Sequence, residues 1–106
     1  MSCVFCEIIA RREPGNIRYE DDDVIVFDNR MRWTPVMMLA MLKQHVSQEE
    51  LWEEHMDKVG PIAIKMGKEH CPNGYRLISN FGRDAMQSQS HGHIHILGGF
   101  YLGPYA

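Results

Sequence analysis

The segment Ser90-His91-Gly92-His93-Ile94-His95-Ile96-Leu97-Gly98-Gly99 carries three of the chain's six histidines at strict two-residue spacing. Successive side chains of a β-strand point to opposite faces, so this spacing predicts a strand with three imidazoles on one face. A buried strand face usually carries Val, Ile or Leu, because every buried imidazole needs hydrogen-bond partners. The alternative is an exposed face that happens to be rich in histidine. We interpret the row as a chemical site for a metal ion or an electrophile.

Four further strands are predicted around this segment. Residues 16–19 and 24–27 have the pattern of a hairpin around the acidic turn at residues 20–23, and residues 75–79 that of a short strand. Residues 36–42 are continuously apolar, which is typical of a central strand covered on both faces.

Two helices complete the predicted fold. A short helix is expected over residues 3–10, and a long one begins at Gln48, because Ser47-Gln48-Glu49-Glu50 is a capping box. The long helix continues to residues 71–74, with a kink or break expected at Pro61. Short strands with one long helix between them predict an α+β domain over residues 1–106, with an antiparallel sheet packed on one face.

Composition excludes several classes of partner. Hydrophobic residues make up 44% of the chain and charged residues 24%, and the formal net charge of -3 offers no electrostatic footprint for nucleic acid. A phosphate-bearing partner is therefore expected to be small. No segment has the 18 or more apolar residues of a membrane span, and the N-terminus lacks the pattern of a secretory signal. A cytoplasmic protein without membrane contact is expected.

The cysteines indicate a metal site. Three cysteines make no even disulfide framework, so the Cys3–Cys6 pair is better explained by metal binding. Two thiolates leave a tetrahedral zinc site half built, and His45 and His91 are the candidates for the other two ligands. A closed, structural zinc site of this kind would fasten the N-terminal segment to the sheet. The alternative is a pair of reduced thiols without a metal.

The loop before the histidine row is rich in hydrogen-bond donors. Residues 80–90 contain amide and hydroxyl side chains, and such donors beside imidazoles suit the several oxygens of a phosphate better than a carbonyl. Most polar loops have no such role, but this one lies next to three histidines.

Residues 91–97 resemble the signature of the histidine triad (HIT) family, His-φ-His-φ-His-φ-φ with φ apolar, at every position but one. Residues 3–10 are similar to the opening of the zinc-bearing, Hint-like branch. Residues 19–22, 43–47 and 87–88 are similar to the family's early hairpin, its lysine-rich turn and its phosphate-binding loop. The resemblance covers nearly the whole chain.

The resemblance implies a HIT-like α+β fold with a five-stranded antiparallel sheet, usually in a homodimer. It also implies a nucleotide-binding hydrolase or transferase that acts at a nucleotide α-phosphate through a covalent nucleotidyl-histidine. Nucleoside phosphoramidates or dinucleoside polyphosphates are the expected substrates, and the partner is a small purine nucleotide. Zinc is structural and no organic cofactor is expected.

The same resemblance assigns roles to individual residues. His93 would attack phosphorus, His95 would contact the α-phosphate or the leaving group, and Asn29 would lie near the ribose hydroxyls. The phosphate contacts would come from Asn80, Gln87 and Ser88. The zinc ligands would be the four residues already named, Cys3, Cys6, His45 and His91.

Several positions depart from the family pattern. Gly92 replaces an apolar residue, which predicts a lost core contact and a looser strand. Asn29 stands in place of a ribose-binding aspartate, for which the neighbouring Asp28 could substitute. Met86 stands in place of a loop glycine, where a side chain would narrow the phosphate site or change the backbone. The aromatic segment 100–106 is expected to pack at a dimer surface.

Two rival functions fit the same residues. The three histidines could bind a catalytic metal ion, as in a metal-dependent hydrolase or oxygenase. Alternatively, the chain could bind nucleotides or act as a scaffold without turnover.

Overall fold

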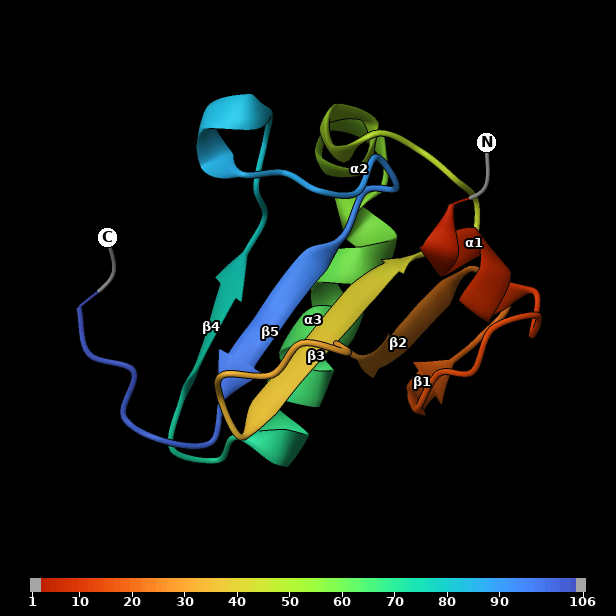
Figure 1. Cartoon of the computed structure of the whole chain (residues 1–106). Coiled ribbons are helices and arrows are strands. Elements are labelled where there is room, and N and C mark those ends of the chain that lie inside the picture. Colours follow the sequence, from red (N-terminus) through yellow and green to blue (C-terminus); the bar gives the residue numbers. More distant parts are fainter. Residues whose placement is uncertain (1–2, 105–106) are drawn as a thin grey trace.

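Five antiparallel strands form one sheet in the spatial order β1-β2-β3-β5-β4 (Figure 1). The computed structural model describes residues 3–104. Its elements are α1 (Val4–Ile9), β1 (Ile17–Glu20), β2 (Val24–Asp28), β3 (Val36–Leu42), α2 (Gln48–Glu54), α3 (Met56–His70), β4 (Tyr75–Ile78), the short helical turn η1 (Arg83–Ala85) and β5 (Ile94–Gly98). The α+β fold predicted from the sequence is confirmed. None of the described helices is long and apolar enough to cross a membrane.

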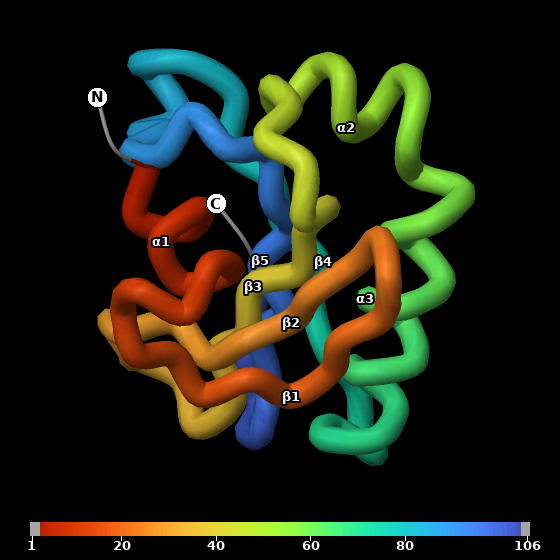
Figure 2. The backbone as a smooth tube through the Cα atoms, turned by 90° about the vertical axis from the view of Figure 1, so that its right-hand side faces the viewer, coloured from red at the N-terminus to blue at the C-terminus, as the bar shows by residue number. Residues whose placement is uncertain are grey.

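The central strand β3 is covered on both faces, as its unbroken apolar run predicts. Met38, Ala40 and Leu42 pack with α3 in one buried cluster. Leu39 and Met41 face the other way and pack against α1 in a second cluster. Figure 2 shows α1 on one side of the sheet and α2 with α3 on the other. The long helical layer thus covers one face of the sheet, as predicted, and α1 packs over part of the other face.

The helix after the capping box breaks earlier than predicted. The Ser47 hydroxyl accepts a hydrogen bond from the Glu50 N–H at 3.1 Å, so the predicted start of α2 is confirmed. The break lies at His55, whose φ of -129° and ψ of 6° are not helical. Pro61 lies inside α3 instead. Because α3 begins at Met56, the missing N–H of Pro61 deprives only an early carbonyl of its partner, which the helix tolerates.

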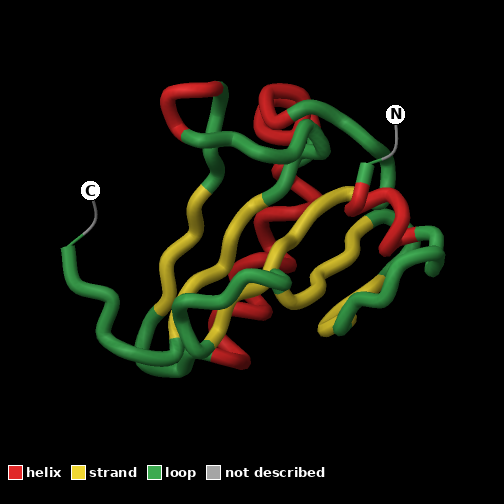
Figure 3. Tube along the Cα trace, in the orientation of Figure 1, coloured by secondary structure: helices red, strands yellow, loops and turns green. Residues whose placement is uncertain are grey.

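The strand that carries the histidine row starts later than predicted. β5 begins at Ile94, so His91 and His93 precede it and only His95 lies within it. The Gly92 N–H donates to the Val46 carbonyl at 2.7 Å, and the His93 N–H donates to the Gln48 side chain at 2.8 Å. Both backbone N–H groups thus bond to residues at or just before the start of α2, and neither bonds to a neighbouring strand. In Figure 3 the segment between β4 and β5 is loop apart from one helical turn.

Gly92 is enclosed rather than loose, contrary to the expectation from the sequence. A Cβ atom at this position would lie 2.7 Å from the Ser47 carbonyl oxygen and 3.1 Å from the Leu51 Cβ. A backbone oxygen cannot move aside as a flexible side chain can. The absence of a side chain at Gly92 therefore lets the start of α2 pack against the histidine segment.

Gly92→Ala is expected to destabilise the protein by about 1–3 kcal/mol, because α2 must shift to make room. In a domain of this size each kcal/mol lowers the melting temperature by about 4–8 °C. The matched control is Gly60→Ala in α3, where the nearest heavy atom to a new Cβ is Met56 Cε at 3.7 Å. That control should gain stability through helix propensity. Equal melting temperatures for the two variants would show that Gly92 is not confined.

Candidate active site and metal centre

A cavity of about 650 Å³ opens on the α1 side of the sheet. Its walls come from α1, the end of β2, the segment at residues 28–33, the loop at residues 80–89, and the histidine segment. The register places Leu39 of β3 beside His95 of β5, and both line this cavity. All the residues predicted from the sequence to bind a nucleotide line it: Asn29, Asn80, Gln87, Ser88, His93 and His95.

His93 is buried and held in one ring orientation. Its side chain is only 4% exposed, and its Nδ1 lies 2.8 Å from the His91 carbonyl oxygen. A carbonyl can only accept, so Nδ1 carries the proton and donates, and Nε2 keeps the free lone pair. The ring of Phe5 meets the His93 ring edge-on at 5.1 Å between centroids. Burial lowers the pKa of His93, so its imidazole is neutral at pH 7 and can act as a nucleophile.

His95 lies beside His93 on the same side of the sheet. The two ring centroids are 5.0 Å apart. Burial, together with the neighbouring His93, lowers the pKa of His95 to about 4. The His95 ring is therefore neutral at pH 7 and offers one N–H donor and one lone pair at the cavity wall.

Gln48 is a buried residue whose role the sequence did not reveal. It is 1% exposed, and its Oε1 accepts the His93 N–H at 2.8 Å. Its Nε2 donates to the Asn80 carbonyl at 3.1 Å. One amide side chain at the start of α2 thus joins the histidine segment to the donor-rich loop. A polar residue in the first turn of a helix is usually exposed, so only the tertiary contact identifies it.

Gln48→Leu is expected to destabilise the protein by about 2–4 kcal/mol, because the buried N–H of His93 and the half-buried carbonyl of Asn80 each lose their partner. The measurement is thermal unfolding, in which this loss lowers the melting temperature by about 4–8 °C for each kcal/mol. Gln44→Leu, the same substitution at an exposed position, should leave the melting temperature within a few degrees of the unmodified protein. A similar small shift for Gln48→Leu would contradict the bridging role.

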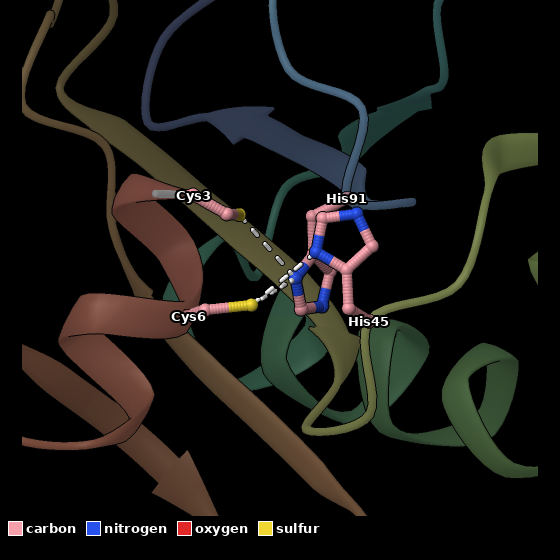
Figure 4. A group of neighbouring side chains, drawn as sticks. All are labelled: Cys3, Cys6, His45 and His91. Atoms are coloured by element: carbon pink, nitrogen blue, oxygen red, sulfur yellow. Dashed lines mark hydrogen bonds between the residues drawn. The ribbon is translucent and has the colours of Figure 1, made fainter. Parts of the chain in front are cut away.

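Four side chains predicted to bind a metal come together at one end of the sheet (Figure 4). Cys3 and Cys6 lie at the start of α1, His45 follows β3, and His91 precedes β5. One ligand atom from each lies within 4.8 Å of all the others. Cys6 Sγ is 3.3 Å from His45 Nδ1 and 3.5 Å from His91 Nδ1, and Cys3 Sγ is 3.7 Å from His91 Nδ1. This cluster could hold a metal ion.

Both ring nitrogens of His91 are engaged away from the cavity. Its Nε2–H donates to the Leu42 carbonyl at 2.8 Å, which leaves the lone pair on Nδ1 facing the two thiols. Burial lowers the pKa of His91 to about 4, so the ring is neutral and can coordinate a metal. Because His91 points to Cys3 and Cys6, it cannot join His93 and His95 around a shared catalytic metal. The geometry thus disfavours the three-histidine metal site.

The expected effect of Met86 on the loop is wrong. Met86 keeps the left-handed conformation that a glycine would adopt, with φ of 60° and ψ of 37°. Its side chain is 84% exposed and points largely to solvent, so it borders the cavity without filling it. The cost is strain of about 1 kcal/mol in a residue that has a Cβ.

Asp28 is not available to replace the missing ribose-binding aspartate. Its carboxylate accepts hydrogen bonds from Arg18 at 2.9 Å and Asn16 at 2.7 Å, and Arg32 lies 3.4 Å away. Burial opposes ionisation of Asp28, but these partners outweigh it and hold its pKa below the usual value. The carboxylate therefore serves the local structure.

The C-terminal aromatic segment runs past the edge strand β4. Arg76 of β4 donates to the Gly103 carbonyl, and Phe100 and Tyr101 are exposed. Tyr105 and Ala106, the end of the segment expected at a dimer surface, lie outside the described residues.

Comparisons with known proteins agree with this geometry. The family model described as "Scavenger mRNA decapping enzyme C-term binding" matches residues 2–103. An uncharacterized HIT-like protein from Synechococcus elongatus is 34% identical over 101 residues, which cover 91% of this chain and 89% of that protein.

Solved structures agree with the fold as well. A HIT family hydrolase from Clostridium thermocellum superimposes with a TM-score of 0.89 at 35% identity, covering 98% of this chain and 96% of that one. A histidine triad protein from Clostridium difficile does so with a TM-score of 0.85 at 33% identity, covering 100% and 97%. The histidine row, the surrounding cavity and these similarities lead to one conclusion: the chain belongs to the histidine triad (HIT) family.

Proposed function

We propose that this protein is a nucleotide-binding hydrolase or transferase that acts at the α-phosphate of a purine nucleotide through a covalent nucleotidyl-His93. The proposal rests on the protonation and ring orientation of His93. Its Nδ1–H is fixed on the His91 carbonyl, and its Nε2 lone pair is free in a ring that lines the cavity. The similarity to a HIT family hydrolase supports the same reaction class.

The reaction proceeds in two displacements. The Nε2 lone pair of His93 attacks phosphorus and forms an N–P bond, while the bond to the leaving group breaks and its electron pair departs with that group, which takes up a proton from solvent. Water, or another acceptor, then attacks the same phosphorus and gives up its proton to solvent, while the N–P bond breaks and its electron pair returns to Nε2, which restores neutral His93. Each step has a lower barrier than one direct displacement. The His91 carbonyl stabilises the positive charge that the imidazole gains in the first step.

The rest of the cavity holds the nucleotide. Asn80, Gln87 and Ser88 provide amide and hydroxyl donors for the phosphate oxygens, and the His95 N–H provides another. Asn29 lies toward the ribose. Apolar walls contributed by Phe27, Trp33 and other residues suit the base. A volume of about 650 Å³ lies within the usual range for small-ligand pockets.

The Cys3, Cys6, His45 and His91 cluster is proposed to hold a structural zinc ion, as in the Hint-like branch. Ordinary Zn–S and Zn–N bond lengths in a tetrahedron place neighbouring sulfur and nitrogen ligands about 3.6 Å apart. The observed Sγ to Nδ1 distances of 3.3–3.7 Å fit that spacing. Bound zinc would tie α1 to the sheet, and α1 contributes Phe5 to the wall beside His93.

The assembly is proposed to be a homodimer of single-domain chains that reside in the cytoplasm. β4 is an edge strand of the sheet, and Phe100 and Tyr101 expose large apolar surface near it. A reducing compartment would keep the thiols of Cys3 and Cys6 available as metal ligands.

The test is a substrate panel comprising a lysyl adenosine phosphoramidate, a dinucleoside polyphosphate and a nucleotide sugar. We expect release of adenosine monophosphate from at least one of the first two at micromolar protein. Adenosine monophosphate itself should bind as a product. Absence of turnover with nucleotide binding retained would favour a non-enzymatic nucleotide-binding protein. Absence of both would overturn the proposal.

A further inference from the structure

We propose that a second subsite beside the ribose end of the nucleotide cavity binds an anionic group, and that the ligand is a nucleoside 5'-phosphate carrying a further phosphate on its ribose. This inference rests on the proposed function, because it places the ribose near Asn29.

The subsite is a second cavity that adjoins the first. It has a volume of about 510 Å³, enough for a phosphate with its hydration. Ile8, Asp28, Asn29 and Arg30 line both cavities, so they form a shared wall. A group attached to a ligand at this wall therefore lies next to the second cavity. Pro14, Gly15, Asn16 and Arg32 form the rest of its lining, and the hollow is open to solvent.

Asn29 offers a donor at this shared wall. Its Oδ1 accepts the Met31 N–H at 3.1 Å, which fixes the orientation of the amide, because a backbone N–H can only donate. No described group accepts a hydrogen bond from its Nδ2. The side chain thus presents N–H to a ligand where an aspartate would present only acceptors. A phosphate, which offers several acceptor oxygens, suits this amide.

The charges around the second cavity favour an anion. Three guanidinium groups, those of Arg18, Arg30 and Arg32, face the carboxylates of Glu13 and Asp28. Local charge is thus positive in a chain whose formal net charge is -3. Arg30 reaches Glu13 at 3.2 Å and Arg32 reaches Asp28 at 3.4 Å, both with side chains about half exposed.

Both ion pairs are long and both guanidinium groups are about half exposed, so each pair contributes little stability, although the Asp28 carboxylate itself is only 10% exposed. An incoming phosphate can therefore recruit Arg30 and Arg32 at small cost, provided that Asp28 keeps other partners. Asp28 keeps Arg18 and Asn16 as partners when Arg32 turns to the ligand. A guanidinium matches the geometry of a phosphate better than that of a single ribose hydroxyl. The two arginines therefore select a phosphorylated ribose over an unmodified one.

The experiment measures dissociation constants by calorimetry for four ligands: adenosine 5'-monophosphate, adenosine 3',5'-bisphosphate, adenosine 2',5'-bisphosphate and inorganic phosphate. We expect one bisphosphate to bind at least about tenfold more tightly than the monophosphate, the gain of one charge-assisted contact. In Arg32→Gln the ratio of the two constants should fall to within about twofold. Arg12→Gln, the same change at an exposed arginine paired with Glu7, should keep the full ratio.

The outcomes separate this inference from the function on which it rests. Binding of the monophosphate with no preference for either bisphosphate overturns the second subsite and leaves the proposed function standing. Failure of every nucleotide to bind overturns the proposed function itself. Inorganic phosphate that binds as tightly as the preferred bisphosphate would show an anion site unconnected with the nucleotide, which also overturns the inference.

Discussion

His93→Ala is expected to abolish nucleotidyl transfer, with a fall in kcat of at least about 10³-fold, because it removes the Nε2 lone pair proposed to attack phosphorus. Removing a buried ring also leaves a small cavity beside Phe5, at a cost of about 1–3 kcal/mol. The chain should remain folded, and adenosine monophosphate should still bind through the donor-rich loop at residues 80–90. The measurement combines turnover, calorimetric binding and thermal unfolding of the same preparation.

His70→Ala provides the matched control, since His70 ends α3 and does not line the cavity. It should keep full turnover. If His93→Ala unfolds, a second variant, His93→Gln, keeps more of the buried volume and tests the chemistry separately. Turnover by either folded His93 variant at a rate near that of the unmodified protein would contradict the nucleophile assignment.

Cys6→Ala is expected to have the largest effect on stability. A structural zinc site can supply on the order of 10 kcal/mol, which is comparable to the 5–15 kcal/mol stability of a whole domain. Losing one ligand should release the metal and lower the melting temperature by at least about 10 °C. The measurement is metal content by elemental analysis, about one zinc per chain in the unmodified protein, together with thermal unfolding.

Cys71→Ala controls for the loss of a thiol. Cys71 is buried next to Gly98 but lies outside the Cys3, Cys6, His45 and His91 cluster. This variant should keep its zinc and lose only the small contribution of one buried sulfur. Equal metal content in Cys6→Ala and Cys71→Ala, or no zinc in the unmodified protein, would contradict the metal centre.

The elements whose pattern is local could be predicted from the sequence. The unbroken apolar run at residues 36–42 gave both ends of β3, and the Ser47 capping box gave the start of α2. The ligand cluster followed from cysteine spacing together with the position of His45 and His91. The strand and the helix start follow from residues next to each other in the sequence. The metal cluster follows from residue types that rarely occur together except as metal ligands.

The features that depend on distant contacts could not be predicted. β5 starts at Ile94 and not at His91, because Val46 and Gln48 take the hydrogen bonds of Gly92 and His93. Gln48 has the pattern of an exposed helix residue and becomes a buried bridge only through Asn80. The hydrogen bond from Arg18 to Asp28 likewise forms only when β1 and β2 pair, so the sequence alone does not reveal it.

The central claim is that His93 forms a bond to phosphorus. The direct measurement is peptide mass spectrometry after the protein is mixed with a lysyl adenosine phosphoramidate and quenched in alkaline denaturant, which preserves the acid-labile N–P bond. The account predicts an adenylyl group on the imidazole of His93, present in the unmodified protein and absent from His93→Ala. Turnover without any adduct on His93, or an adduct on another residue, would contradict it.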